Sequence, residues 1–432
     1  MRITHNQIAL FSLTIFPIFT LIVRGWTSSI LFFYLLVSVV YLIKNKLLSL
    51  SAFREKFYSE NPRLLLIAIP FAMPMIGILL TAMGKHIFEW HDLDGPSRYF
   101  FATIFLLFLM YRKPDIQKYL ILSITLMPVI TTVLIRSVHI DGWSLSSRLT
   151  VYFIDPITFG SLCLSFGLLS LALACQHLRN NLVFLWCCLS ACCGFYLSLA
   201  SESRTGWLSI PFALFLILVY GFRISFIKTT ILSLIITALA TLTLYQTSDI
   251  VHNKMNQSIQ DVRSYQWAGG ELNSTSIGDR ISFARIGWSL MMQRPLTGWA
   301  NLDPTPHLEN SEFSKFANAA TRLGVWGGGF HNEFINNGAK YGIIGFVFTI
   351  ALLLGPGIFF FQILRTQRNN RFALLGVIFV VAQGISCLSY QVLDFKFTSS
   401  LYALMIVSLA YLALSELKLN FLNGIIKNPP KS

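Results

Sequence analysis

The sequence predicts an all-α integral membrane protein with about twelve transmembrane helices and one large, partly helical loop outside the cytoplasm. Of its 432 residues 54% are hydrophobic and only 12% are charged, and the mean hydropathy is +0.63. A soluble domain carries about a quarter charged residues, so this chain lacks the polar surface that water requires. Its apolar residues gather in runs of about 15–25, long enough to cross about 30 Å of hydrocarbon as a helix.

The apolar runs, taken in order, predict the individual helices. The first run follows Met1-Arg2 and lacks a small-residue cleavage site, so we expect a retained helix rather than a signal peptide. The predicted ranges are 8–23, 28–43, 63–83, 99–112, 117–135, 156–176, 181–200, 205–222, 226–246, 341–364, 371–390 and 397–415.

The positive charges predict the orientation. With the N-terminus in the cytoplasm, cytoplasmic segments hold 18 Lys and Arg residues, the short external loops hold 7, and 15 of the 19 carboxylates fall outside. Orientation follows the Lys/Arg bias of short loops, so we expect both termini in the cytoplasm. The chain then divides into 1–246 with transmembrane helices 1–9, a large external loop 247–340, and 341–432 with helices 10–12 and a short cytoplasmic tail. A loop of that length is typical of a functional element.

The net charge of +14 does not indicate a nucleic-acid partner. The Lys and Arg residues lie between the apolar runs, as topology signals and contacts with membrane lipids do, and no nucleic-acid-binding motif is present. Cys187, Cys188, Cys192 and Cys193 lie inside an apolar run without a nearby histidine or carboxylate, which favours helix packing over metal binding. No other group shows metal-ligand spacing, so we expect neither a metal nor a cofactor.

A first candidate site is the segment 201–207, between two predicted helices on the external side. It contains Glu202 and Arg204. An arginine near hydrocarbon is costly and faces a cavity, a partner or the interface. Arg204 therefore either binds a ligand, or reaches lipid headgroups or pairs with Glu202.

A second candidate is the segment 278–291. Asp279 is a plausible N-cap and Pro295 a plausible stop, which predicts a helix lying on the bilayer with Arg280 in its first turn. The free amides of a helix start and a guanidinium both suit an anionic phosphate. The alternative is an interfacial helix that touches only lipid phosphates. The apolar residues at helical spacing are Ile281, Ala284, Trp288 and Met291.

A third candidate follows the glycines 327–329, which allow a tight turn before His331 and Asn332. The glycines are not a phosphate-binding P-loop, because no Gly-Lys-Ser/Thr follows them. The turn delivers His331 to a predicted helix start near the membrane surface, where histidine suits the role of proton acceptor for a hydroxyl nucleophile. A purely structural histidine is the alternative.

In order and spacing, these three places resemble the O-antigen ligase family of bacterial envelope enzymes and its wider relatives, the O-antigen polymerases and protein O-oligosaccharyltransferases. The resemblance covers about 190–345. It is carried by Ser203-Arg204-Thr205-Gly206-Trp207, by Arg280 with Trp288 and Pro295-Leu296-Thr297-Gly298, and by His331-Asn332 with Gly338 and Tyr341-Gly342-Ile343-Ile344-Gly345.

The resemblance implies an O-antigen ligase of the bacterial cell inner membrane, with its active site on the periplasmic face and the large loop in the periplasm. The donor would be an undecaprenyl-diphosphate-linked O-antigen and the acceptor a sugar hydroxyl of lipid A–core, with metal-independent, inverting transfer. The catalytic residues implied are His331 as base and Arg280 and Arg204 as oxyanion clamps. Arg285 would join the two arginines on the diphosphate, and Asn332, Trp288 and Glu202 would support the site.

Three alternatives stay open. An O-antigen polymerase is associated with two sizeable external loops, and a protein O-oligosaccharyltransferase with an additional C-terminal periplasmic domain, whereas this sequence predicts one loop and a short tail. A lipid-linked oligosaccharide flippase or other transporter predicts charges inside the helices near the membrane midplane, and here the charges lie at helix ends and in loops.

Overall fold

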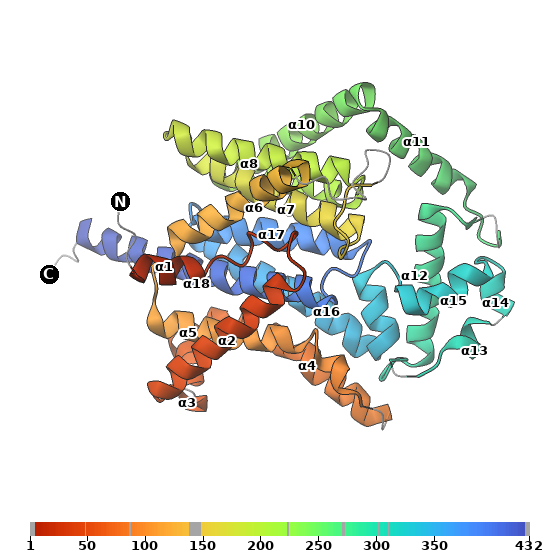
Figure 1. Ribbon diagram of the computed structural model, residues 1–432, viewed down its shortest axis with the longest axis horizontal. Helices are drawn as coiled ribbons and strands as arrows, with labels where there is room; N and C mark the ends of the chain where they lie inside the picture. The colour runs from red at the N-terminus through yellow and green to blue at the C-terminus, as the bar shows by residue number, and fades with distance from the viewer. Residues whose placement is uncertain are drawn as a thin grey trace.

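The protein is a bundle of helices with a helical loop subdomain at one end (Figure 1). The computed structural model describes residues 5–47, 49–85, 88–137, 148–222, 224–269, 273–300, 302–309 and 311–427, and contains no β-strand within them. Among these residues eight helices are long and apolar enough to cross a membrane. The all-α membrane class is therefore confirmed, whereas the count of twelve spans and the sidedness stay predictions.

Helices occupy eleven of the twelve predicted ranges. The bundle consists of α2 (Trp26–Lys44), α4 (Leu65–Lys85), α5 (Ser97–Arg112), α6 (Gln117–Ser137), α7 (Pro156–Gln176), α8 (Asn181–Ala200), η4 (Thr205–Leu208) continued by α9 (Ser209–Leu216) and η5 (Ile217–Gly221), α10 (Phe226–Thr247), α16 (Glu333–Thr366), α17 (Arg371–Cys387) and α18 (Lys396–Lys427). Short elements on the flanks are α1 (His5–Ser12), α3 (Leu50–Arg54), η1 (Glu55–Glu60), η2 (Pro62–Leu64) and η3 (Trp90–Leu93).

The prediction of a continuous first helix over 8–23 is wrong. α1 ends at Ser12, and turns lead from there to α2. Pro17 lies in the middle of the predicted range, where its ring clashes with the preceding turn and removes a backbone donor. Gly25, with φ +76°, then begins α2 as its N-cap.

Small residues let the central helices approach closely. A Cβ atom added to Gly194 of α8 would lie 2.7 Å from the Cys163 carbonyl oxygen and 2.7 Å from the Gly167 Cα of α7. Close backbone approach at glycines is how helices associate where no water drives them together. α7, α17 and α18 are covered by their neighbours, while α10 lies at the edge and exposes apolar side chains.

The loop subdomain (residues 248–332) has a hydrophobic core of its own. It contains α11 (Asp249–Ser264), α12 (Ser276–Gln293), α13 (Thr305–Leu308), α14 (Ser311–Ser314) and α15 (Ala319–Gly328). Ile286, Leu290, Phe313 and Phe330 are buried together in this core. α12 runs across the direction of α7 and α17, at the end of the bundle (Figure 1).

A kink in α16 joins the subdomain to the bundle. Gly342 has φ +67°, and a Cβ atom there would lie 2.3 Å from the Pro295 carbonyl oxygen. Gly298 has φ +63° and faces the Lys340 carbonyl equally closely. Backbone bonds from Ala300 N–H to Lys340 O (2.9 Å) and from Ile343 N–H to Pro295 O (2.7 Å) close the joint. The Pro-Leu-Thr-Gly and Tyr-Gly-Ile-Ile-Gly motifs are therefore two halves of one joint.

Candidate functional site

Arg204 lies in the turn that ends α8, and it ties this turn to the loop subdomain. Its Nη1 donates to the Lys254 carbonyl oxygen and to Ser258 Oγ, both on α11. Glu202, held at φ +54°, pairs instead with Lys254 Nζ at 2.8 Å. The Glu202–Arg204 pair that the sequence left open is therefore not formed. Burial, above all, lowers the pKa of Arg204.

Packing against α7 fixes the position of this turn. A Cβ atom added to Gly160 of α7 would lie 1.9 Å from Ser201 Oγ, so the turn rests directly on the α7 backbone. Ser203 Oγ donates to the Ile157 carbonyl oxygen at 3.2 Å. Arg148 Nε donates to the Ser201 carbonyl oxygen at 3.1 Å, which brings a second guanidinium to the same turn.

Arg280 is presented by α12, although not in its first turn as predicted. The N-cap is Thr275, whose Oγ1 accepts from Gly278 N–H at 3.1 Å, and the prediction of Asp279 as cap is wrong. Thr275 competes successfully because its hydroxyl reaches the N3 amide, as a capping side chain must. Asp279 instead accepts from Thr321 Oγ1 at 3.0 Å. The amides at the start of α12 are thus used within the protein, which leaves the Arg280 guanidinium as the candidate group for an anion.

The electrostatic environment of Arg280 is cationic. Burial lowers its pKa, and the charges of Arg204 and Arg148 lower it further. No carboxylate within the described part of the chain is among the charges that act on it. We call Arg148, Arg204 and Arg280 the arginine cluster. A guanidinium that is partly removed from water and faced only by like charges is well suited to an anionic ligand.

His331 is held in a strained conformation next to this cluster. Its φ is +49°, in the left-handed region that residues other than glycine rarely adopt. Gln391, with its amide oxygen turned toward the chain, accepts from the N–H groups of Phe330 (2.8 Å) and His331 (3.2 Å). A Cβ atom added to Gly329 would lie 2.0 Å from the Gln391 side chain, which explains why the third of the three glycines is required. Backbone strain of this kind persists only where surrounding structure enforces it.

Ring contacts hold the His331 imidazole. It stacks on Phe283 of α12 (centroids 5.5 Å, 15°) and lies 5.2 Å from the Tyr390 ring. Nδ1 is buried and has no hydrogen-bond partner among the described residues. Burial lowers the pKa of His331, and the charge of Arg280 lowers it further, against the opposing charges of Asp155 and Asp279. The ring is therefore neutral, and able to accept a proton, further into the acidic range than an ordinary histidine.

Asp155 and Tyr390 are site residues that the sequence analysis missed. The Asp155 carboxylate caps α7 by accepting from Ile157 and Thr158 N–H, both at 2.9 Å. Burial, together with the charge of Asp155, raises the pKa of Tyr390 to about 12. The Asp-Pro pair before a helix is a recognisable cap signal, but it gives no sign that α7 begins beside His331.

The third predicted diphosphate ligand and the predicted supporting residues have different contacts in the structure. Arg285 donates to Tyr265 Oη (3.2 Å) and the Trp267 carbonyl oxygen (2.9 Å), so its donors bind within the loop subdomain. Trp288 is 50% exposed on α12. Asn332 caps α16 by accepting from Ile335 N–H at 3.1 Å and donates to the Leu388 carbonyl oxygen at 3.0 Å. Of the diphosphate ligands predicted from the sequence, Arg204 and Arg280 lie in one electrostatic cluster, and Arg285 is engaged elsewhere.

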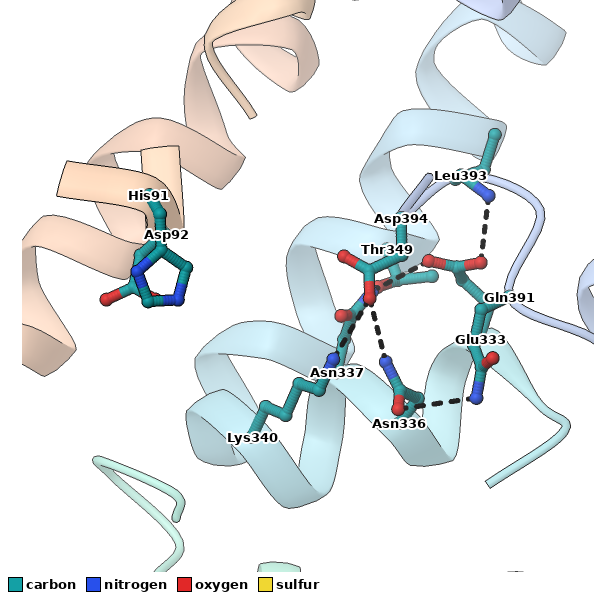
Figure 2. A network of polar contacts seen from close by, with 10 residues as sticks. All are labelled: His91, Asp92, Glu333, Asn336, Asn337, Lys340, Thr349, Gln391, Leu393 and Asp394. Atoms are coloured by element: carbon teal, nitrogen blue, oxygen red, sulfur yellow. Dashed lines mark hydrogen bonds and ion pairs between the residues drawn. The ribbon is translucent and has the colours of Figure 1, made fainter. Parts of the chain in front are cut away.

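A network of polar side chains anchors the start of α16 to the segment before α18 (Figure 2). Glu333 is fully buried and accepts from Leu393 N–H (2.9 Å) and Asn337 Nδ2 (3.1 Å). Asp394 accepts from Asn336 Nδ2 at 3.2 Å and from Lys340 Nζ at 3.1 Å. Gln391, which holds His331, belongs to the same segment, so this network also positions the histidine.

The helix bundle and the site indicate a multi-pass membrane protein. At its loop end, this protein carries a histidine beside an arginine cluster. Residues 188–350 match the model of the O-antigen ligase family. The resemblance read from the sequence is therefore confirmed for this segment, which contains Arg204, Arg280 and His331. An uncharacterized protein of Haemophilus influenzae (strain Rd) is 25% identical over 193 residues, which are 43% of this chain and 46% of the relative. The match thus spans less than half of that relative's length.

Proposed function

We propose that the protein is an O-antigen ligase, which transfers O-antigen from undecaprenyl diphosphate to a sugar hydroxyl of lipid A–core at the periplasmic face of the bacterial inner membrane. The observation that carries the proposal is the environment of Arg280, whose guanidinium is partly buried, faces Arg204 and Arg148, and acts electrostatically on His331. An anion site beside a proton acceptor is what transfer from a diphosphate leaving group requires. Both termini would then lie in the cytoplasm.

The proposed reaction is a direct displacement. The acceptor hydroxyl oxygen bonds to the anomeric carbon, the bond from that carbon to the diphosphate oxygen breaks, and His331 takes the hydroxyl proton. Undecaprenyl diphosphate leaves with additional negative charge, which Arg280 and Arg204 stabilise. A single displacement inverts the anomeric configuration.

The donor site in this proposal also couples to the loop subdomain. Arg204 reaches α11 through Lys254 and Ser258, and Arg280 belongs to α12, so the two clamps come from either side of the boundary between bundle and loop. A diphosphate bound there would bridge the two parts. The single large loop supports a ligase over a polymerase, which remains the second candidate because the family covers both reactions.

The experiment is complementation of a cognate ligase-deficient strain, read as the lipopolysaccharide pattern on a gel. Wild type, Arg204→Ala, Arg280→Ala and His331→Ala are compared at matched membrane levels. We expect the wild type to restore the O-antigen ladder and each variant to leave lipid A–core uncapped. A wild type that leaves the core uncapped overturns the ligase proposal, and variants that still make a full ladder overturn the three assigned roles.

A further inference from the structure

A polar cavity lies at the first turns of α16, where Lys340 and Tyr341 line it. Its volume is about 280 Å³. α4 and α5, whose connection lines it, lie below α16 in Figure 1, whereas α7 and α8 lie above. The side chains that define it are Asp94, Trp326, Lys340, Tyr341, Asp394 and Lys396, and we call it the paired pocket.

The charges of the paired pocket neutralise one another. Lys340 Nζ lies 3.1 Å from Asp394 Oδ2, and Lys396 forms an ion pair with Asp94 across the mouth. Both lysines are therefore occupied by carboxylates, and Asp92 adds another acidic group to the wall. Such a lining repels a free phosphate rather than collecting it, in contrast with the arginine cluster.

The same lining suits an uncharged sugar ring. Carboxylate oxygens accept hydrogen bonds from hydroxyl groups, and such charge-assisted bonds are stronger than neutral ones. Trp326 adds a partly buried indole to the lining, against which the apolar face of a sugar packs, whereas the Tyr341 ring is largely buried beside Phe348. A few placed polar groups on an aromatic wall are the usual composition of a small-molecule site.

We propose that the paired pocket binds a neutral sugar residue of the acceptor oligosaccharide, and so positions the acceptor for attack; this inference rests on the proposed ligase function. The segment 389–395 connects the two places, because Gln391 holds the backbone of His331 while Asp394 lines the pocket. Lys340 lies seven residues along α16 from Glu333, about 10 Å at the rise of a helix. An oligosaccharide of a few residues spans such a distance, so a sugar bound beside Lys340 would leave another residue of the same chain near the start of α16, which His331 precedes.

The test uses the full-length protein in lipid nanodiscs, with Trp326→Ala and Asp94→Asn. At saturating donor, we expect each variant to raise the KM for the acceptor about tenfold, the loss of one good contact. The KM for the donor and the kcat at saturating acceptor stay within twofold of wild type. Trp90→Ala is the matched control, because Trp90 is 83% exposed in the adjacent element η3 and outside the pocket lining.

A binding measurement separates this inference from the proposed function. The probe is dephosphorylated core oligosaccharide. Its binding to the nanodisc-embedded protein is measured by saturation-transfer NMR in the absence of donor. Binding that Trp326→Ala and Asp94→Asn abolish supports the pocket, even if the wild type transfers no glycan and the ligase proposal falls. Active protein whose two variants keep the acceptor KM and the oligosaccharide binding of wild type, or raise only the donor KM, overturns the pocket.

Discussion

The arginine cluster and the paired pocket are both rich in charge, yet their charges are arranged in opposite ways. In the cluster, Arg280 is faced by two further guanidiniums and by no carboxylate of the described residues. In the pocket, both Lys340 and Lys396 are matched by aspartates. The two regions thus differ in how their charged side chains are paired, rather than in how many charged side chains they contain, and this pairing decides which ligand each region suits. Arg280 thus suits a diphosphate, although Asp261 and Glu202 act on the neighbouring Arg204, and the matched ions of the pocket leave carboxylate oxygens for hydroxyl groups.

His331 is linked to both regions by its contacts and by the charges that act on it. Its pKa responds to Arg280, and its backbone is held by Gln391 from the segment that also supplies Asp394. In the proposed reaction, His331 takes the proton of the acceptor sugar while the arginine cluster stabilises the leaving diphosphate. Breaking each side separately tests whether the two regions have separate roles.

Removing Arg280 is expected to have the largest effect. Arg280→Ala should lower the transfer rate about 10²–10³-fold, the usual cost of one oxyanion-stabilising group. Arg280→Lys should restore only part of it, because an ammonium lacks the planar fork of donors. The measurement is the transfer rate at matched protein levels in nanodiscs. The control is Arg263→Ala, an exposed arginine at the end of α11, and an equal loss in that variant would show that general loop charge matters rather than the cluster.

How far the sequence predicts this site depends on whether the signal is local. Arg204, Arg280 and His331 follow from residue chemistry in short segments, and hydropathy predicts the helices that carry them. Asp279 was the cap expected for α12, but the structure caps this helix with Thr275, while Asp279 accepts a hydrogen bond from Thr321. Which of two nearby polar residues caps a helix is decided by tertiary contacts and not by the local sequence alone.

The paired pocket illustrates the part that no local pattern predicts. Asp94, Trp326, Lys340 and Asp394 come from four separate segments, and none stands in a motif. Their meeting depends on the kink at Gly342, where the Pro295 turn packs against α16. Long-range convergence of this kind follows from the fold, so it becomes visible only in three dimensions.

Substitution of Gly329 tests whether activity requires the backbone of His331 to be held by Gln391. The Gly329 backbone has φ +82° and ψ 162°, a region essentially restricted to glycine, where another residue costs about 1–3 kcal/mol. In Gly329→Ala the new methyl group also displaces Gln391 from His331, so we expect a loss of activity approaching about 10²-fold. The matched control is Gly328→Ala, since a Cβ atom there meets nothing within 4 Å. Equal activities of the two variants in transfer assays would refute the requirement for Gln391.

Substitution of Glu333 tests whether the polar network at the start of α16 positions both His331 and the paired pocket. Glu333→Ala leaves the buried Leu393 N–H without its acceptor, which costs about 1–3 kcal/mol of stability. Glu333→Gln keeps one oxygen for that amide and should cost less. Thermal unfolding in detergent measures both variants, and transfer assays should show the acceptor KM rising together with a fall in rate. If Glu333→Ala unfolds like wild type, the network in Figure 2 does not anchor the segment.

The smallest expected effect is a shift in the pKa of His331. Its direction shows which of the nearby charged groups acts on the imidazole. The groups that act on it are Arg280 and Asp279 of α12 and Asp155 at the start of α7, with Tyr390 in ring contact. Since His331 must be neutral to accept a proton, the rate rises with pH through its lowered pKa and then levels off.

Asp155→Asn removes a negative charge that favours the protonated ring, so the pKa of His331 should fall further and the acid limb should move to lower pH. Asparagine is an effective N-cap, and its single amide oxygen can replace Asp155 Oδ1, so α7 remains capped. Arg280→Lys, which retains the positive charge, should leave the limb near its wild-type position despite the lower rate. A limb that moves to higher pH in Asp155→Asn would mean that the titrating group is not His331, because loss of a nearby carboxylate can only disfavour its protonated form.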